Sequence, residues 1–186
     1  MTGQIADQVR YNGEVYSLVG VNGEGLPVPA DFGMKTTMAS TACWRGYQMF
    51  YDCLNDELIL DAMLANPDEV KPVNGVKPRN TKDSWGFNQL YENIGFKTKF
   101  TGHILVGRNF VQEMYVHMGF QSAESYRDVL ELDVEDGNIV NVINLRDVME
   151  QRRLQGRHKP TSPLSMEETD LYSWIEDRFS QDYNDE

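Results

Sequence analysis

Three tight-turn signals constrain the fold of this chain more than any other feature of the sequence. Asn12-Gly13, Asn55-Asp56 and Asp136-Gly137 each lie between segments rich in β-branched, aromatic or aliphatic residues. Asparagine, aspartate and glycine tolerate the positive φ angles that two-residue hairpin turns require. The spacing therefore predicts a mainly β protein, an antiparallel β-sandwich or open barrel built from hairpins, with a C-terminal helix.

The segments around these turns predict hairpins over residues 9–19, 42–64 and 127–145, and a further strand over residues 96–106. Residues 109–118 fit two structures. As a helix they would begin after an Asn109 N-cap and end at Gly119, and this interpretation is preferred. If residues 109–118 and residues 122–126 are both helical, the fold class is α+β, which is the alternative to the mainly β class.

The chain is expected to divide into three regions. Residues 1–145 form a β-rich domain with a long insertion at residues 66–93, rich in proline and glycine, which is interpreted as a linker or a lid. Residues 146–163 form a basic polar linker or short helix. Residues 164–186 form an acidic amphipathic helix and tail, because Leu171, Trp174, Ile175 and Phe179 share one stripe at helical spacing.

The charge balance bounds the choice of partner. The formal net charge is −12, which disfavours direct binding to nucleic acid or to an anionic membrane and favours basic proteins, peptides or cations. No signal peptide or membrane-spanning run is recognised, and the two cysteines are too few for a disulfide framework. We therefore expect a cytoplasmic protein.

The densest group of chemically versatile side chains is Trp44, Arg45 and Tyr47. A guanidinium beside aromatic rings suits an anionic or stacking ligand, and Gly46 permits close approach of a ligand or another backbone. The alternative interpretation is that Arg45 forms a structural ion pair while Trp44 and Tyr47 pack in the core.

Two histidines in the β-rich region form a second candidate group with a glutamate. On the preferred helix, Glu113 and His117 would lie four residues apart on one face, and His103 belongs to the preceding strand. An acid–base pair is one interpretation, and exposed or locally satisfied histidines are the other. The spacing matches no metal-ligand motif, so no metal and no cofactor are predicted.

The C-terminal helix carries an apolar stripe that requires burial. The stripe consists of Leu171, Trp174, Ile175 and Phe179. It either packs onto the parent sheet or docks into a partner, and a homo-oligomer is one form of the second alternative. The acidic outer face of the helix also suggests imitation of a phosphate backbone.

The absence of catalytic motifs favours a cytoplasmic, non-catalytic binding or regulatory module that engages a protein partner through its acidic surface and C-terminal helix. The alternative is a small-ligand-binding protein or an enzyme of hydrolase or isomerase type. Its pocket would lie inside the sheet, with Arg45, Tyr47, His103 and His117 lining it and the insertion closing it. A further alternative is a nucleic-acid mimic that inhibits a DNA- or RNA-binding protein.

Overall fold

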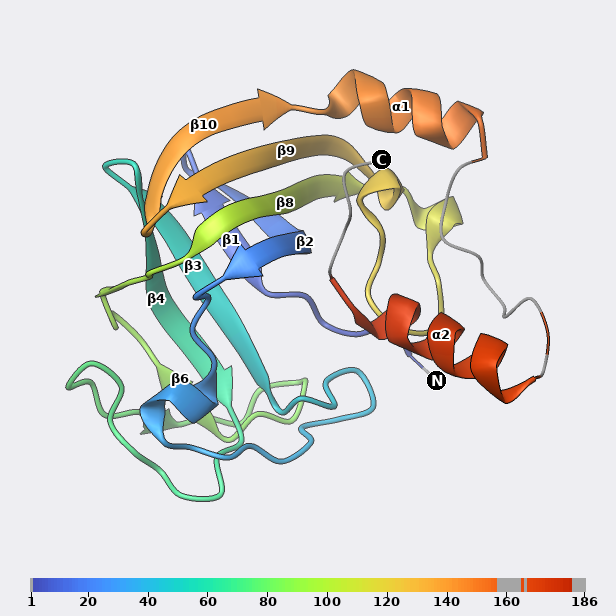
Figure 1. Cartoon of the computed structure of the whole chain (residues 1–186). Coiled ribbons are helices and arrows are strands. Elements are labelled where there is room, and N and C mark those ends of the chain that lie inside the picture. Colours follow the sequence, from blue (N-terminus) through green and yellow to red (C-terminus); the bar gives the residue numbers. More distant parts are fainter. Residues whose placement is uncertain (1, 157–164, 166, 182–186) are drawn as a thin grey trace.

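A closed barrel of seven β-strands forms the body of the protein, as the computed structural model shows (Figure 1). The structure describes residues 2–156, 165 and 167–181. The barrel strands are β1 (Gln8–Tyr11), β2 (Glu14–Glu24), β3 (Tyr47–Leu54), β4 (Glu57–Ala65), β8 (Thr101–Phe110), β9 (Tyr126–Glu135) and β10 (Asn138–Asn144). The remaining elements are β5 (Arg79–Asn80), β6 (Gln89–Tyr91), β7 (Phe96–Lys97), the 3₁₀ turns η1 (Pro29–Phe32), η2 (Gln112–Met114) and η3 (Ala123–Ser125), and the helices α1 (Arg146–Leu154) and α2 (Glu168–Phe179).

The predicted mainly β class with a C-terminal helix is confirmed, with one refinement of the sheet. The strand order is β10-β9-β8-β2-β1-β3-β4, and a pairing between β10 and β4 closes the barrel. The β1–β3 pairing is parallel, whereas the other barrel pairings are antiparallel. The barrel is therefore a closed mixed sheet rather than a purely antiparallel sandwich or open barrel.

The three turn signals form the hairpins predicted from them. Each turn residue has a positive φ angle, 50° at Asn12, 52° at Asn55 and 46° at Asp136. Each turn joins neighbouring antiparallel strands, β1–β2, β3–β4 and β9–β10. These conformations match the type I′ turn, whose twist suits paired strands.

Two local predictions are wrong, and the strand predicted over residues 96–106 is confirmed only in part, because it is divided between β7 and β8. The strand predicted over residues 42–52 begins only at Tyr47, because residues 40–46 form a turn closed by a bridge between Ser40 and Cys43. The helix predicted over residues 109–118 is absent. Strand β8 instead continues to Phe110, which pairs with Tyr126 of β9, and η2 follows it.

Side chains fill the interior of the barrel. Six of the seven barrel strands contribute buried side chains to the core, namely Val9, Leu18, Met49, Tyr51, Leu58, Leu60, Met63, Ile104, Val106, Leu132 and Val134. The seventh strand, β10, packs against this core through the partly buried Ile139 and Val142. The insertion is fastened to this body through Tyr91, which is fully buried and pairs with Met63 of β4. The interior is thus a packed core, and candidate binding surfaces lie outside the barrel.

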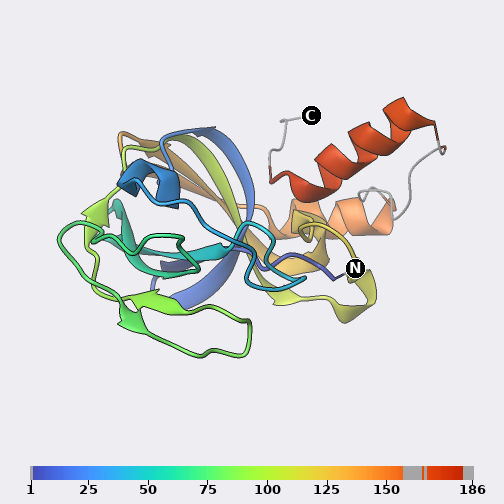
Figure 2. The ribbon, with the colours of Figure 1, turned by 90° about the horizontal axis from the view of Figure 1, so that it is seen from below.

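Both helices lie at one end of the barrel, and the insertion lies at the opposite end (Figure 2). Helix α1 covers the outer face of the sheet through Met149, which packs in a second buried cluster with Val19, Leu105 and Val129. Residues 146–154 are therefore a short helix, the second of the two predicted alternatives. Residues 157–163 lie outside the described part of the chain. Among the described helices, none is long and apolar enough to cross a membrane.

Candidate functional site

An ion pair between Asp7 and Arg45 forms the floor of the candidate site. The Arg45 guanidinium donates two hydrogen bonds to the Asp7 carboxylate, at 2.9 and 2.5 Å. The same carboxylate accepts the backbone N–H of Met49 at 2.6 Å, which ties the pair to strand β3. The side chains are only 22% exposed for Arg45 and 7% for Asp7. The structural ion pair that was the alternative interpretation of Arg45 is therefore present.

The environment keeps Arg45 charged. Burial lowers the pKa of the guanidinium, but the adjacent Asp7 carboxylate more than offsets this effect, so the pKa lies above its ordinary value. Asp7 also balances the charge of Arg45, and this leaves the site close to neutral. The Nε atom of Arg45 is buried without a hydrogen-bond partner among the described residues.

The turn before β3 determines where these side chains point. Gly46 has a φ of 74°, and a Cβ atom there would lie 2.0 Å from the Thr37 carbonyl oxygen. The close approach that the sequence suggested is thus made by the chain's own backbone. The turn directs Trp44 to the surface, where 46% of the residue is exposed, while Arg45 turns inward. Trp44 is therefore not a core residue.

A groove of about 420 Å³ lies above the ion pair. It is lined by Gln4, Val21, Trp44, Arg45, Tyr47, Phe120, Phe179 and Gln181. The Arg45 guanidinium lies over the Tyr47 ring at 4.7 Å and over the Phe120 ring at 5.7 Å. The groove thus combines aromatic walls with a polar, charge-balanced floor, which suits an aromatic or aliphatic side chain better than a free anion.

The C-terminal helix closes one side of this groove. The Phe179 ring stacks on Trp44, with ring centroids 5.0 Å apart and an interplanar angle of 21°. Beyond the helix, the carbonyl of Gln181 accepts the Val21 N–H at 2.7 Å, and its side-chain amide donates to the Leu18 carbonyl. The two predicted candidate regions therefore meet at the groove, where Phe179 of the C-terminal helix contacts Trp44 of the Arg45 segment.

The histidine candidates do not gather around the groove. His117 is exposed, and its ring packs edge-on against Tyr115 at 4.9 Å, while Glu113 is exposed in η2. His103 lies on β8 and hydrogen-bonds Asp133 of β9 at 2.7 Å. The predicted pocket lined jointly by Arg45, Tyr47, His103 and His117 is not formed among the described residues, because core side chains fill the barrel interior.

Several residues of the site carry no sequence signal. Asp7 lies 38 positions from Arg45 in the sequence, and Phe120 lies still further away. The sequence predicts that Arg45 could pair with a carboxylate, but nothing in the local pattern distinguishes Asp7 from the other acidic residues.

The thiol nearest the groove is not activated. Burial raises the pKa of Cys43, and this effect exceeds the opposing influence of Arg45. Burial, together with Asp52, raises the pKa of Cys53 to about 12. Because the thiolate is the nucleophilic form, neither cysteine is poised for covalent catalysis near neutral pH.

We expect Cys53 in the folded protein to react with iodoacetamide at pH 8 far more slowly than a free cysteine. A pKa raised from 9.0 to about 12 leaves on the order of a thousandfold less thiolate. Mass spectrometry of the alkylated protein over time measures the rate. Protein unfolded in guanidinium chloride is the control and should label quickly at both cysteines. Native labelling at the unfolded rate would contradict the expectation.

The fold and the groove together define a closed β-barrel protein whose C-terminal helix packs across an aromatic surface groove. Comparison of the chain with protein-family models, with curated proteins and with solved structures finds no match in any of the three.

Proposed function

We propose that the protein is a non-catalytic binding module that engages a basic protein partner, and that an aromatic side chain of the partner replaces Phe179 in the groove. The observation that carries the proposal is the Phe179–Trp44 stack. It supports the groove as a receptor for an aromatic ring. In this mechanism the C-terminal helix occupies its own binding site until a partner competes for it.

The partial burial of α2 supports such an exchange. Leu171, Trp174, Ile175 and Phe179 are each only half-buried, and none of the described α2 side chains is fully buried. A helix of 12 residues is marginal when isolated in water, so α2 depends on its contacts with the barrel. An aromatic pair contributes about 0.5–1.5 kcal/mol beyond its area burial, which a partner's own aromatic side chain can match.

Charge supports a basic partner. The chain has a net charge of −12, and Glu167, Glu168 and Glu176 are exposed on or next to α2. Such a field accelerates the approach of a positively charged protein and repels nucleic acid. We place this activity in the cytoplasm, because two free cysteines persist most readily in a reducing compartment.

The exchange predicts opposite effects for two substitutions. We expect a lysine-rich peptide with one central phenylalanine to bind Trp44→Ala at least severalfold more weakly than the native chain, because the stacking surface is lost. We expect Phe179→Ala to bind it severalfold more tightly, because the internal competitor is gone. Fluorescence anisotropy with the labelled peptide at low salt measures both constants.

Two controls isolate the aromatic contact. Tyr172 is on the same helix and is 60% exposed, so Tyr172→Ala should leave the affinity unchanged. A peptide in which alanine replaces phenylalanine reports the purely electrostatic attraction. Equal binding of the two peptides would overturn the aromatic exchange. Weaker binding by Phe179→Ala would instead show that α2 contacts the peptide directly.

A further inference from the structure

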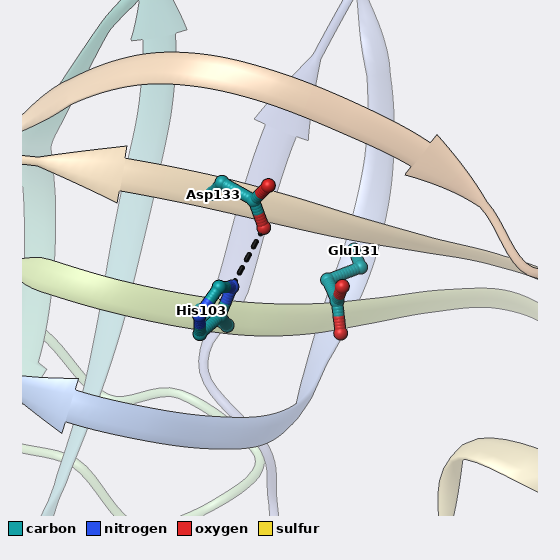
Figure 3. A group of neighbouring side chains, drawn as sticks. All are labelled: His103, Glu131 and Asp133. Carbon is teal, nitrogen blue, oxygen red and sulfur yellow. Dashed lines mark hydrogen bonds and ion pairs between the residues drawn. The ribbon is translucent and has the colours of Figure 1, made fainter. Parts of the chain in front are cut away.

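Three potential metal ligands converge on the outer face of strands β8 and β9. His103 belongs to β8, and Glu131 and Asp133 belong to β9 (Figure 3). His103 pairs directly with Asp133 in the sheet register, and Glu131 is two residues along the same strand. Because side chains alternate across a strand, Ile104 and Leu132 point into the barrel core while these three residues point outward.

The ligand atoms are close enough to share an ion. One ligand atom from each residue lies within 4.8 Å of the others. Two atoms that bind the same Zn²⁺ at about 2.0–2.2 Å lie at most about 4.4 Å apart, so modest side-chain rotations bring all three into range. The strands hold their backbones in fixed register, which reduces the cost of assembling the site.

A neighbouring strand orients the central carboxylate. One oxygen of Asp133 is 2.7 Å from Nδ1 of His103, and the other accepts the side-chain amide of Asn141 on β10 at 2.9 Å. The Asn141 hydrogen bond therefore holds the Asp133 carboxylate in place beside His103. Hydrogen-bonded support of this kind fixes the orientation of ligands in metal sites.

We propose that His103, Glu131 and Asp133 bind a divalent transition-metal ion such as Zn²⁺. One imidazole and two carboxylates suit Zn²⁺, Fe²⁺ or Mn²⁺, whereas Mg²⁺ and Ca²⁺ prefer oxygen ligands alone. The site is open to solvent, since 43% of the His103 side chain and 21% of the Asp133 side chain are exposed. Three protein ligands also leave a coordination position for water or for a donor from another molecule.

Isothermal titration of the full chain, without an affinity tag, with Zn²⁺ tests the proposal. We expect one ion per chain with micromolar affinity, and affinity at least about tenfold weaker in His103→Ala, Glu131→Gln and Asp133→Asn. Asn141→Ala should weaken binding by about tenfold while leaving all three ligands in place. Mg²⁺ should give no comparable heat. Circular dichroism verifies that each variant is folded.

The three histidines of the chain supply a matched control. The double variant His117→Ala/His158→Ala leaves His103 as the sole histidine and should retain full Zn²⁺ affinity. Co²⁺ substitution gives a second readout, a visible absorption band that should vanish in His103→Ala and persist in the double variant. Loss of binding in the double variant, or native affinity in His103→Ala, would overturn the assignment, as would no Zn²⁺ binding at all.

Discussion

Replacing Asp7 with alanine is expected to lower the free energy of unfolding by about 3–5 kcal/mol, the usual effect of removing one partner from a buried ion pair. The substitution leaves the largely buried Arg45 guanidinium without its counter-charge. It also removes the acceptor for the Met49 N–H, a buried donor of strand β3. The loss is large because the remaining groups keep their desolvation cost without the compensating bonds.

Urea denaturation followed by tryptophan fluorescence measures this change. The double variant Asp7→Ala/Arg45→Ala should lose less stability than the sum of the single variants, because the second substitution removes the charge that the first leaves unpaired. Glu92→Ala is the matched control. It breaks the exposed ion pair with Arg79, which is 2.8 Å long, and should leave stability essentially unchanged. An Asp7→Ala loss below about 1 kcal/mol would contradict a structural role for the pair.

The hairpins were predictable because their information is local. Asn12-Gly13 and Asp136-Gly137 determine a turn and hence the pairing of the two strands that flank it. The parallel β1–β3 pairing has no such signal. It joins segments that are more than 40 residues apart in the sequence. The Arg10–Asp52 ion pair, 2.8 Å long, links two residues that are partners in this pairing. Closure of the barrel is equally non-local.

The wrong helix over residues 109–118 has an identifiable physical cause. The spacing of Phe110 and Met114 fits both a helix and a strand, so the interpretation relied on Asn109 as an N-cap. In the structure Asn109 has a φ of 61°, whereas an N-cap residue requires an extended conformation. The pairing of Phe110 with Tyr126 prolongs strand β8 instead. Tertiary pairing thus decided a segment whose local preferences were balanced.

The candidate site was partly predictable, because some of its contacts join residues that are close in the sequence. The contact between Arg45 and Tyr47 joins near neighbours in sequence and followed from the pattern, as did the helical spacing of Phe179. The partners of His103 did not, because Asp133 is 30 residues away and is placed only by the β8–β9 register. The sequence groups His103 with His117 because both are histidines of the β-rich region, and no local pattern shows that they lie apart.

Gly137→Ala is expected to destabilise the protein by about 2–5 kcal/mol, because it strains a turn and separates the closing strands of the barrel. Gly137 has a φ of 76°, and a Cβ atom there would lie 2.1 Å from the carbonyl oxygen of Thr98. Gly137 lies at the seam where β10 meets β4. Its N–H donates a hydrogen bond to the Phe100 carbonyl, and its carbonyl accepts one from the Leu58 N–H, both at 2.8 Å. Any shift that relieves the clash therefore weakens the bonds by which β10 meets β4.

Gly13→Ala separates the strain of the turn from the cost of the steric clash at the seam. Gly13 occupies the equivalent position of the β1–β2 turn with a φ of 79°, and nothing lies within 4 Å of its added Cβ. Its substitution should cost only the about 1–2 kcal/mol of left-handed strain. Urea denaturation of both variants gives the difference, expected to be about 1–3 kcal/mol. Equal losses of unfolding free energy in the two variants would mean that the clash at the seam does not destabilise the protein, and that the other strand pairings alone hold the barrel closed.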